Sequence, residues 1–279
     1  MKKISRRSFM AAAAVSVAAL ALTACGGSSA STASSVASSA ASSEAASTSA
    51  AAGELTTVEA GKLTMATNAT FPPYEMTTDA GEFEGIDIET AQAIADKLGL
   101  ELQIDDMDFD AALLSVQQGK ADIVMAGVTV TDERKAVMDF SDSYATGIQS
   151  IIVPNDSDIA SPDDLAGKKI GTQRGTTGYI YCSDDFGEDS VVAYDSGLTA
   201  VQALNNGQVD AVVIDNAPAT EYVAANPGLK VLDTSYAEED YAIGMAKGSA
   251  LEDAVNKALE ELKADGTLQA IVDKYINAN

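Results

Sequence analysis

The stretch "AALLSVQQGKADIVMAG", residues 111–127, returns in related form at residues 199–215 as "TAVQALNNGQVDAVVID". The two stretches superpose at an offset of 88 residues, which aligns Gly119 with Gly207, Asp122 with Asp210 and Val124 with Val212. Each stretch predicts a helix that ends at the glycine, a tight turn and a buried strand. Two similar units this far apart favour two lobes of like topology over a solenoid of short repeats.

The sequence around the first unit alternates between two kinds of pattern. Apolar runs such as "KLTMAT" (62–67) and "ELQI" (101–104) flank "DIETAQAIADKLG" (87–99), whose apolar residues recur with helical period. This alternation predicts an α/β fold with mostly parallel sheets. Near the C-terminus, Ser249 and Glu252 predict a capping box at the start of an amphipathic helix, which Gly266 separates from a last short helix.

The N-terminal residues predict export and lipidation. Basic residues between positions 2 and 7 precede a short apolar run that ends at "LTAC" (22–25), a sequence that resembles a bacterial lipobox. We therefore expect residues 1–25 to be a lipoprotein signal peptide, with Cys25 acylated by palmitate or a similar chain. "SRRSFM" (5–10) also resembles a twin-arginine signal, so the export route stays open. The alternative is an internal anchor helix with an incidental cysteine.

Residues 26–53 are almost entirely Ser, Ala, Thr and Gly, a composition that predicts a disordered tether. The expected location is extracytoplasmic, with lipid anchoring the protein to the outer face of the cell membrane. Loss of the signal peptide removes four positive charges and no negative ones, which takes the net charge from −25 to −29. Nucleic acid is excluded as a partner, because so acidic a surface repels phosphate.

Histidine and cysteine usage limits the chemistry. The chain has no histidine, which excludes Ser-His and Cys-His nucleophile pairs and histidine-ligated metal sites. We expect no catalytic residue, no metal and no cofactor. Cys182 would be the only cysteine left after lipidation, so no disulfide can form within the mature chain, and we expect this residue in the core.

The two repeated strands end at "MAG" and "VID", so Gly127 and Asp215 should face one site. Beyond the first strand, Thr131 can cap a short helix and Thr129 lies just before it. Arg134 in the first turn of that helix can point back over the cap and bind a carboxylate through its planar fork. The alternative is an Arg134 that only pairs with an acidic neighbour in solvent.

The second lobe offers "GTTG" (175–178) after a predicted strand. Thr176 and Thr177 can give N–H and hydroxyl donors to the same carboxylate, although a plain turn is the default interpretation. Asp215 suits an ammonium group, and capping the helix that follows is compatible with that role.

Aromatic residues supply candidate walls for the site. Two consecutive prolines in "ATNATFPPYEM" (66–76) hold the loop extended, which places Phe71 and Tyr74 at its corners. Phe109, just before the helix from residue 110, is a further candidate, and a plain core position is the alternative for each.

These motifs, together with "FEGIDIETAQAIADKL", "VTVTDERKAVMDFSDSY" and "AVVIDNAPA", resemble the solute-binding proteins of bacterial ABC importers for polar amino acids, the family 3 type. The resemblance covers nearly all of residues 60–276. It implies a two-lobed type II periplasmic-binding-protein fold, with two crossover strands near residues 146–150 and 237–241. By that resemblance lobe 1 comprises residues 54–147 and 238–279, and lobe 2 comprises residues 148–237.

The resemblance also implies roles for individual residues. Phe71 and Phe109 would flank the ligand side chain, and Asp215 would take the α-ammonium group. The α-carboxylate would be held by Gly127, Thr129, Arg134 and Thr176.

Asn68 stands where many relatives have an acid, and Asn68 and Gln173 would lie where the ligand side chain is read. A neutral polar amino acid is therefore expected over a basic one, because a buried cation would lack a fixed counter-charge. The expected function is capture of a free amino acid by a monomer and its delivery to an ABC permease, without enzymatic activity. A dehydratase of a cyclic amino-acid precursor and a sensory ligand-binding protein are the alternatives.

Overall fold

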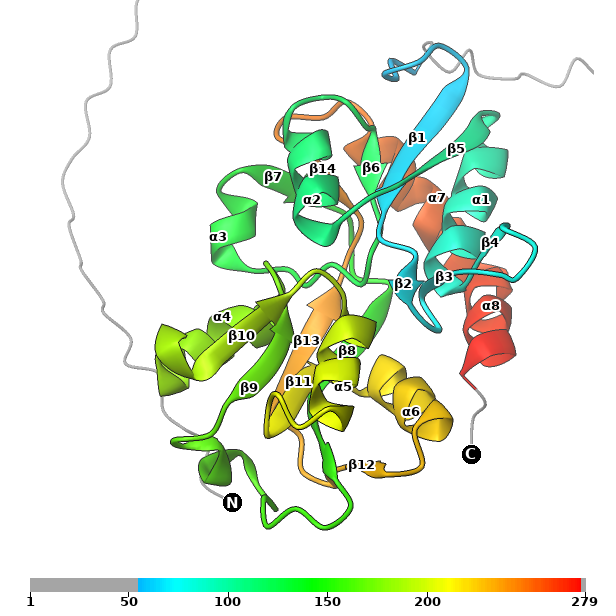
Figure 1. Ribbon diagram of the computed structural model, residues 1–279. Helices are drawn as coiled ribbons and strands as arrows, with labels where there is room; N and C mark the ends of the chain where they lie inside the picture. Colours follow the sequence, from blue (N-terminus) through cyan, green and yellow to red (C-terminus); the bar gives the residue numbers. More distant parts are fainter. Residues whose placement is uncertain (1–54, 277–279) are drawn as a thin grey trace, which may run out of the picture. The chain divides into compact units, whose positions relative to one another are not determined.

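Two separate β-sheets, each covered by helices, organise the structure, a computed structural model that describes residues 55–276 (Figure 1). The first sheet has the strand order β5-β1-β6-β14-β7. β1 pairs in parallel with β5 and β6, and β14 runs antiparallel to β6. The strands of this sheet are β1 (Lys62–Thr67), β5 (Glu101–Asp106), β6 (Ile123–Val124), β7 (Met138–Phe140) and β14 (Gly244–Ala246).

The second sheet has the order β10-β9-β11-β8-β12, with β13 paired to β8 off this path. β9 pairs in parallel with β10 and β11, and β8 runs antiparallel to β11. Its strands are β8 (Ala145–Pro154), β9 (Ile170–Gln173), β10 (Val191–Tyr194), β11 (Ala211–Asp215), β12 (Leu229–Val231) and β13 (Ala237–Tyr241).

The repeated sequence occupies the same place in both sheets. Each copy forms a helix followed by the strand that lies between the central parallel strand and an antiparallel one, and φ is 66° at the glycine that ends each helix. Asp122 accepts a hydrogen bond from the backbone N–H of Thr64 over 2.8 Å, and Asp210 accepts the equivalent bond from Lys169 over 2.8 Å. The two units of like topology are thus confirmed. The helices and strands are α2 (Phe109–Gln117) with β6 and α5 (Gly197–Asn205) with β11.

Helices cover both faces of each sheet, which explains the continuous apolar runs of the central strands. In the first sheet, one apolar cluster joins the strands to α1, α7 and α8, and a second joins them to α2. In the second sheet, α5 and α6 pack on one face and α4 on the other. The bounds of these helices are α1 (Ile86–Leu98), α4 (Thr177–Phe186), α6 (Asn216–Ala225), α7 (Glu252–Ala264) and α8 (Thr267–Tyr275). Within residues 55–276, no helix has the length and apolar character needed to cross a bilayer.

The chain passes between the two sheets through β8 and β13, which pair antiparallel from Ala145 opposite Tyr241 to Gln149 opposite Ala237. The C-terminal half of β8 continues into the second sheet beside β11 and β12. Gly147 is required in this ribbon, because a Cβ atom there would lie 2.4 Å from the Tyr241 ring.

The remaining elements are short. A three-stranded sheet has the order β2-β3-β4 and lies before α1 in the chain. The capping box expected from Ser249 is not formed: α7 begins at Glu252 with no side-chain cap, and the Ser249 hydroxyl instead accepts a hydrogen bond from Leu251 N. Gly266 separates α7 from α8 as expected. The short elements are β2 (Thr70–Phe71), β3 (Glu75–Thr77), β4 (Phe83–Glu84), α3 (Asp132–Lys135), η1 (Pro162–Leu165) and η2 (Glu188–Ser190).

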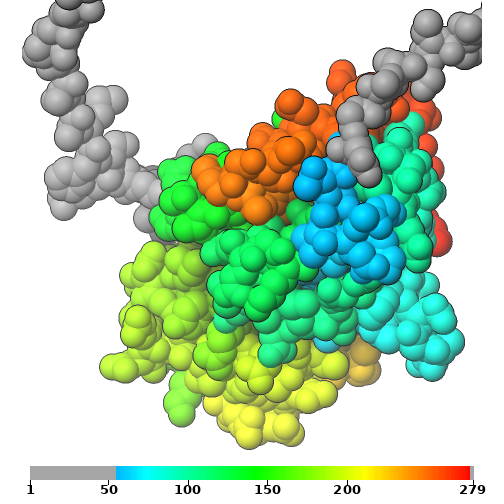
Figure 2. All heavy atoms as spheres, turned by 90° about the horizontal axis from the view of Figure 1, so that it is seen from above, coloured from blue at the N-terminus to red at the C-terminus, as the bar shows by residue number. Residues whose placement is uncertain are grey.

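Segments that belong to the two sheets also meet through side chains. A Cβ atom on Gly175 would lie 1.6 Å from Asp110 Oδ1, so the start of α2 approaches the loop after β9 closely. In the view from above, the green atoms of the α2 region adjoin yellow-green and yellow atoms of the second sheet's segments (Figure 2). The hydroxyl of Tyr222 on α6 donates to the carbonyl oxygen of Thr70.

Candidate functional site

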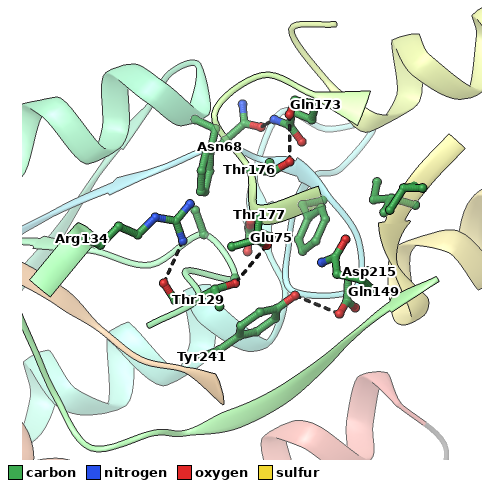
Figure 3. Close-up of a pocket in the computed structure, with 16 residues that line it drawn as sticks. Asn68, Glu75, Thr129, Arg134, Gln149, Gln173, Thr176, Thr177, Asp215 and Tyr241 are labelled. Carbon is green, nitrogen blue, oxygen red and sulfur yellow. Dashed lines mark hydrogen bonds between the residues drawn. The ribbon is translucent and has the colours of Figure 1, made fainter. Parts of the chain in front are cut away.

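A pocket lies at the carboxyl ends of β1, β6, β9 and β11, where ligands bind in open α/β sheets (Figure 3). The empty space within the pocket and at its solvent-exposed mouth totals about 450 Å³. The residues expected at a site from sequence that line it are Asn68, Phe71, Phe109, Gly127, Thr129, Arg134, Gln173, Thr176, Thr177 and Asp215. The residues that line it in addition are Glu75, Ala126, Gln149, Val213, Ile214 and Tyr241.

Tyr74 is not among the lining residues. Its side chain is buried, its ring stacks on Phe71 with centroids 5.8 Å apart, and it meets Tyr241 edge-on at 5.4 Å. Tyr74 therefore supports two walls of the pocket from behind. The Phe71 ring packs against the cores of both sheets.

Arg134 brings an unpaired positive charge to the pocket. Thr131 caps α3 by accepting a hydrogen bond from Arg134 N, as the sequence predicts. The guanidinium donates to two backbone carbonyls, Thr129 O over 2.8 Å and Gly175 O over 3.1 Å, and lies 5.4 Å from the centre of the Phe109 ring. Among the described residues no carboxylate forms a salt bridge with it. Burial lowers the pKa of Arg134, and the nearby Glu239 opposes that change.

Hydroxyl groups surround the same end of the pocket. The Thr129 and Thr177 hydroxyl oxygens are 3.4 Å apart, and Thr129 also donates to Glu239 Oε2 over 2.9 Å. Thr176 caps α4 through its side chain, so the free backbone N–H groups at the N-terminus of α4 lie beside the pocket. A carboxylate placed here would find a guanidinium, a helix N-terminus and hydroxyl donors together.

Asp215 lies across the pocket from Arg134 in Figure 3. Its carboxylate caps α6 by accepting from Ala217 N over 3.1 Å, and it accepts from Ile148 N over 2.8 Å and from the Tyr241 hydroxyl over 2.9 Å. Burial raises the pKa of Asp215 to about 6, and these hydrogen bonds oppose the rise. Among the described residues no cation forms a salt bridge with this carboxylate.

Glu75 on β3 is the least satisfied group of the pocket. Its side chain is fully buried, and within residues 55–276 neither carboxylate oxygen has a hydrogen-bond donor. Burial raises the pKa of Glu75 well above its usual value, and the adjacent Asp87 carboxyl on α1 raises it further. A buried carboxyl without a donor is costly unless it is protonated or meets a cation.

Residues 63–278 match the bacterial extracellular solute-binding proteins, family 3. The chain belongs to this family. The extracytoplasmic location expected from the sequence is confirmed at the level of the family.

Individual relatives of this family 3 solute-binding protein bind different amino acids. It is 34% identical over 225 residues to the L-cystine-binding protein TcyJ of Escherichia coli strain K12, across 79% of this chain and 85% of that protein. The structure of the arginine-, lysine-, histidine-binding protein ArtJ from Geobacillus stearothermophilus superposes with a TM-score of 0.75 at 34% identity, covering 78% of this chain and 96% of that one. An ancestral arginine-binding protein bound to arginine superposes with a TM-score of 0.74 at 43% identity, covering 78% of this chain and 99% of that one.

In this family 3 solute-binding protein, three groups expected to contact a ligand already form hydrogen bonds within the protein. The Gly127 N–H, expected at the α-carboxylate, donates to Asp87 Oδ2 over 3.0 Å. Gln173 Nε2 donates to Asn68 Oδ1 over 2.8 Å, and Asn68 Nδ2 donates to Met107 O over 2.9 Å. The Asn68 amide therefore has its principal partners within the protein.

Glu75 and Tyr241 are two lining residues that the sequence patterns did not indicate. Glu75 follows the two prolines in a strand of three residues, too short to show a period of its own. Tyr241 is the last residue of the crossover strand β13, which lies outside the repeated units in the sequence. The acid after "PPY" was a usable signal, because an ionisable residue within a predicted buried loop needs a partner. Among the described residues, no group of three or more His, Cys, Asp or Glu side chains is arranged to hold a metal ion.

Proposed function

We propose that this protein binds one free amino acid with a cationic side chain in the pocket and delivers it to the permease of an ABC transporter. The single observation that carries this is the charge pattern of one pocket: among the described residues, Arg134 forms no salt bridge with a carboxylate, and the buried carboxyls of Asp215 and Glu75 form none with a cation. A zwitterion with an additional positive side chain complements all three groups.

The α-carboxylate is proposed to bind Arg134, with Thr129 and the N-terminus of α4 as further donors. The α-ammonium is proposed to bind Asp215, which keeps its second role as the cap of α6. Phe71 and Phe109 line the pocket and would contact the aliphatic part of the ligand. Because the two sheets contribute different halves of these contacts, we expect the lobes to close on the ligand.

The ligand proposed here has a cationic side chain, whereas Asn68 led us to expect a ligand with a neutral one. The sequence argument assumed that no fixed counter-charge faces the side chain, whereas Glu75 lines the pocket and is fully buried. Asn68 is moreover held by Gln173 and Met107. The relatives ArtJ and the ancestral arginine-binding protein, which are described as binding basic amino acids, support this choice.

The test is a melting scan of the purified full chain against all twenty amino acids, ornithine and cystine. A ligand present at a hundredfold over its dissociation constant should add about 2.7 kcal/mol to the free energy of unfolding. We expect L-arginine, L-lysine or L-ornithine to give the largest rise. A scan in which no amino acid raises the melting temperature would contradict the function, and one led by glutamine would restore the neutral ligand.

Glu75 also gives the dehydratase alternative the general acid that it requires, because burial keeps this carboxyl protonated to a higher pH. Incubation of the full chain with prephenate and with its amino analogue, followed by measurement of product absorbance, tests that activity. We expect no turnover, because in the proposed function Glu75 pairs with the cationic side chain of the ligand and Asp215 pairs with its α-ammonium group.

The membrane anchor and the division of the chain are also proposals. Cys25 and residues 26–53 lie outside the described residues, and we propose a lipidated Cys25 on a flexible tether. Changing Cys25 to Ser should release the protein from membranes, and retention of that variant would contradict the anchor. We propose lobe boundaries between residues 147 and 148 and between residues 237 and 238, within the ribbon that β8 and β13 form.

A further inference from the structure

Glu75 and Asp87 bring two buried carboxyl groups together beside the pocket. Both residues are fully buried, and the N-terminus of α1 is fixed against the strand that carries Glu75 because Asp87 N donates to Tyr74 O over 2.8 Å. Gly85 permits this approach, since a Cβ atom there would lie 2.2 Å from Tyr74 O and its φ is 132°. Besides burial, the neighbouring Asp87 carboxyl raises the pKa of Glu75.

The two carboxyls differ in their hydrogen bonds. Asp87 Oδ2 accepts from Gly127 N over 3.0 Å and from the Tyr144 hydroxyl over 2.8 Å, two donors that favour its ionised form. Within the described part of the chain, Asp87 Oδ1 and both oxygens of Glu75 have no donor. A proton on Glu75 can therefore be shared with Asp87 Oδ1, whereas among the described residues no hydrogen-bond donor or salt bridge stabilises an ionised Glu75.

The charges around the pair are mostly negative. The negative charge of Asp106 on β5 raises the pKa of Glu75. The neutral hydroxyls of Tyr74, Tyr144 and Tyr222 also lie near Glu75. Asp215 and Tyr241 line the same pocket from the second sheet and the returning strand. Among the described residues, the one cation that lines the pocket is Arg134, whose guanidinium donates to Thr129 O and Gly175 O. Two adjacent anions without a counter-charge would be prohibitively costly here.

We propose that Glu75 and Asp87 form a proton-exchanging subsite: the pair holds one shared proton in the empty pocket and releases it when the cationic end of the ligand side chain arrives. The O–H bond of the carboxyl group breaks, the proton passes to solvent, and the resulting carboxylate pairs with the ammonium or guanidinium group, which keeps its own protons. This inference rests on the proposed function. Burial raises the pKa of Glu75 well above its usual value and that of Asp87 to about 6, consistent with a shared proton near neutral pH.

Linkage gives the pH dependence its sign. A ligand that favours the ionised pair binds more tightly as pH rises, because fewer protons must then be displaced. With one proton released, the affinity for L-arginine should rise by up to about tenfold per pH unit between the pKa of the pair with ligand and that of the empty pair. L-glutamine carries no side-chain charge and should displace no proton.

The experiment is titration calorimetry of the full chain with L-arginine, L-lysine and L-glutamine at pH 6.5, in phosphate and in Tris buffer. The dependence of the observed heat on the ionisation enthalpy of the buffer gives the number of protons released. We expect close to one proton for each basic amino acid and none for glutamine. Glu75→Gln should bind arginine at least tenfold more weakly and release no proton, because Asp87 then stays ionised by its own two donors.

Glu82→Gln is the matched control, since Glu82 is exposed just before β4 and its substitution should leave both values unchanged. Tight arginine binding with no proton released by the native chain overturns the subsite and leaves the proposed function intact. Binding of glutamine alone overturns the subsite and the basic ligand together. Absence of binding by any of the three amino acids, repeated in the melting scan, overturns the proposed function and the subsite with it.

Discussion

Gln173 and Asn68 are joined by a hydrogen bond of 2.8 Å from Gln173 Nε2 to Asn68 Oδ1, across 105 residues of sequence. Asn68 follows β1 of the first sheet, and Gln173 ends β9 of the second. Both side chains are buried, so the bond is shielded from water. The two amides expected to read a ligand thus bind each other and link the two sheets at the pocket.

If the lobes separate in the empty protein, this bond exists only in the closed form. Asn68→Ala and Gln173→Ala should then each weaken arginine binding by about 0.5–1.5 kcal/mol, the usual net value of such a bond. The double variant should lose little more than either single variant, because both remove the same interaction. Calorimetry on the three variants measures this coupling. Asn205→Ala, which breaks an exposed bond to Asn226, is the control; strictly additive losses would show that the link does not assist closure.

Arg134→Ala should fold and lose on the order of 2–5 kcal/mol of amino-acid binding, because the ligand carboxylate would be desolvated without its partner. Arg134→Lys should also bind poorly, since a point charge cannot reproduce the planar fork that now spans Thr129 O and Gly175 O. Calorimetry compares both with Arg174→Ala. Arg174 is exposed, and its ion pair with Asp195 is weak because the two groups are 3.8 Å apart in solvent. Loss of Arg174 should therefore leave the affinity unchanged. Affinity near the native value in Arg134→Ala would remove this residue from the site.

Gly85→Ala should reduce the free energy of unfolding by about 1–3 kcal/mol, because the new Cβ would strike the Tyr74 carbonyl and an L residue at φ 132° is strained. Since α1 would shift from β3, arginine binding should weaken as well. Gly81→Ala separates the two causes: φ there is 84°, but nothing lies within 4 Å of the added atom. Denaturant unfolding and calorimetry of both variants make the comparison. Equal effects in the two would mean that the contact with β3 does not matter.

The unliganded protein should lose stability as pH rises above about 4. Burial raises the pKa of Asp87 and of Asp215 to about 6 and that of Glu75 well above its usual value, so the folded state binds these protons more tightly than the unfolded state. Their contribution is fully present below the unfolded values and declines as pH rises through the folded ones, by at most about 1.4 kcal/mol per pH unit for each group.

Glu75→Gln should remove the share of that decline that Glu75 contributes. Unfolding by denaturant at half-unit steps from pH 5 to pH 8.5 gives the two curves. Among the other carboxyls, Asp265 has its pKa lowered to about 2 by hydrogen bonds and acts only at more acid pH. Parallel curves for the native chain and the variant would show that Glu75 ionises as freely in the fold as in the unfolded chain.

The sequence could predict those parts of the molecule that depend on local pattern. The repeat around Gly119 and Gly207 predicts two sheets of like topology, because a helix, a turn and a strand each leave a periodic signal. The cap at Thr131 and the position of Arg134 one turn later follow from helix-start preferences that act over a few residues. The rule that ligands bind beyond the carboxyl ends of the strands predicts Asp215 as a site residue, because it ends a repeated strand.

The rest depended on contacts between distant segments. The environment of Glu75 depends on α1, whose first residues pack against the backbone of Tyr74 at Gly85. Hydrophobic periodicity in the sequence does not predict such a contact. The Asn68–Gln173 bond likewise needs the relative position of two sheets, which neither strand encodes alone. The expectation of a neutral ligand rests on Asn68 and Gln173, whereas the basic ligand proposed here rests on the buried position of Glu75, which the sequence does not show.

Cys182 lies fully buried in the core of the second sheet, where burial raises the pKa of its thiol to about 12. No other cysteine occurs within residues 55–276, so the surface of this part of the chain has no reactive thiol. Leu114 on α2 and Leu198 on α5 are large, exposed and attached to different sheets. Leu114→Cys together with Leu198→Cys would therefore accept a pair of thiol-directed dyes without competition from the core, and the protein would become an optical sensor of the amino acid that it captures.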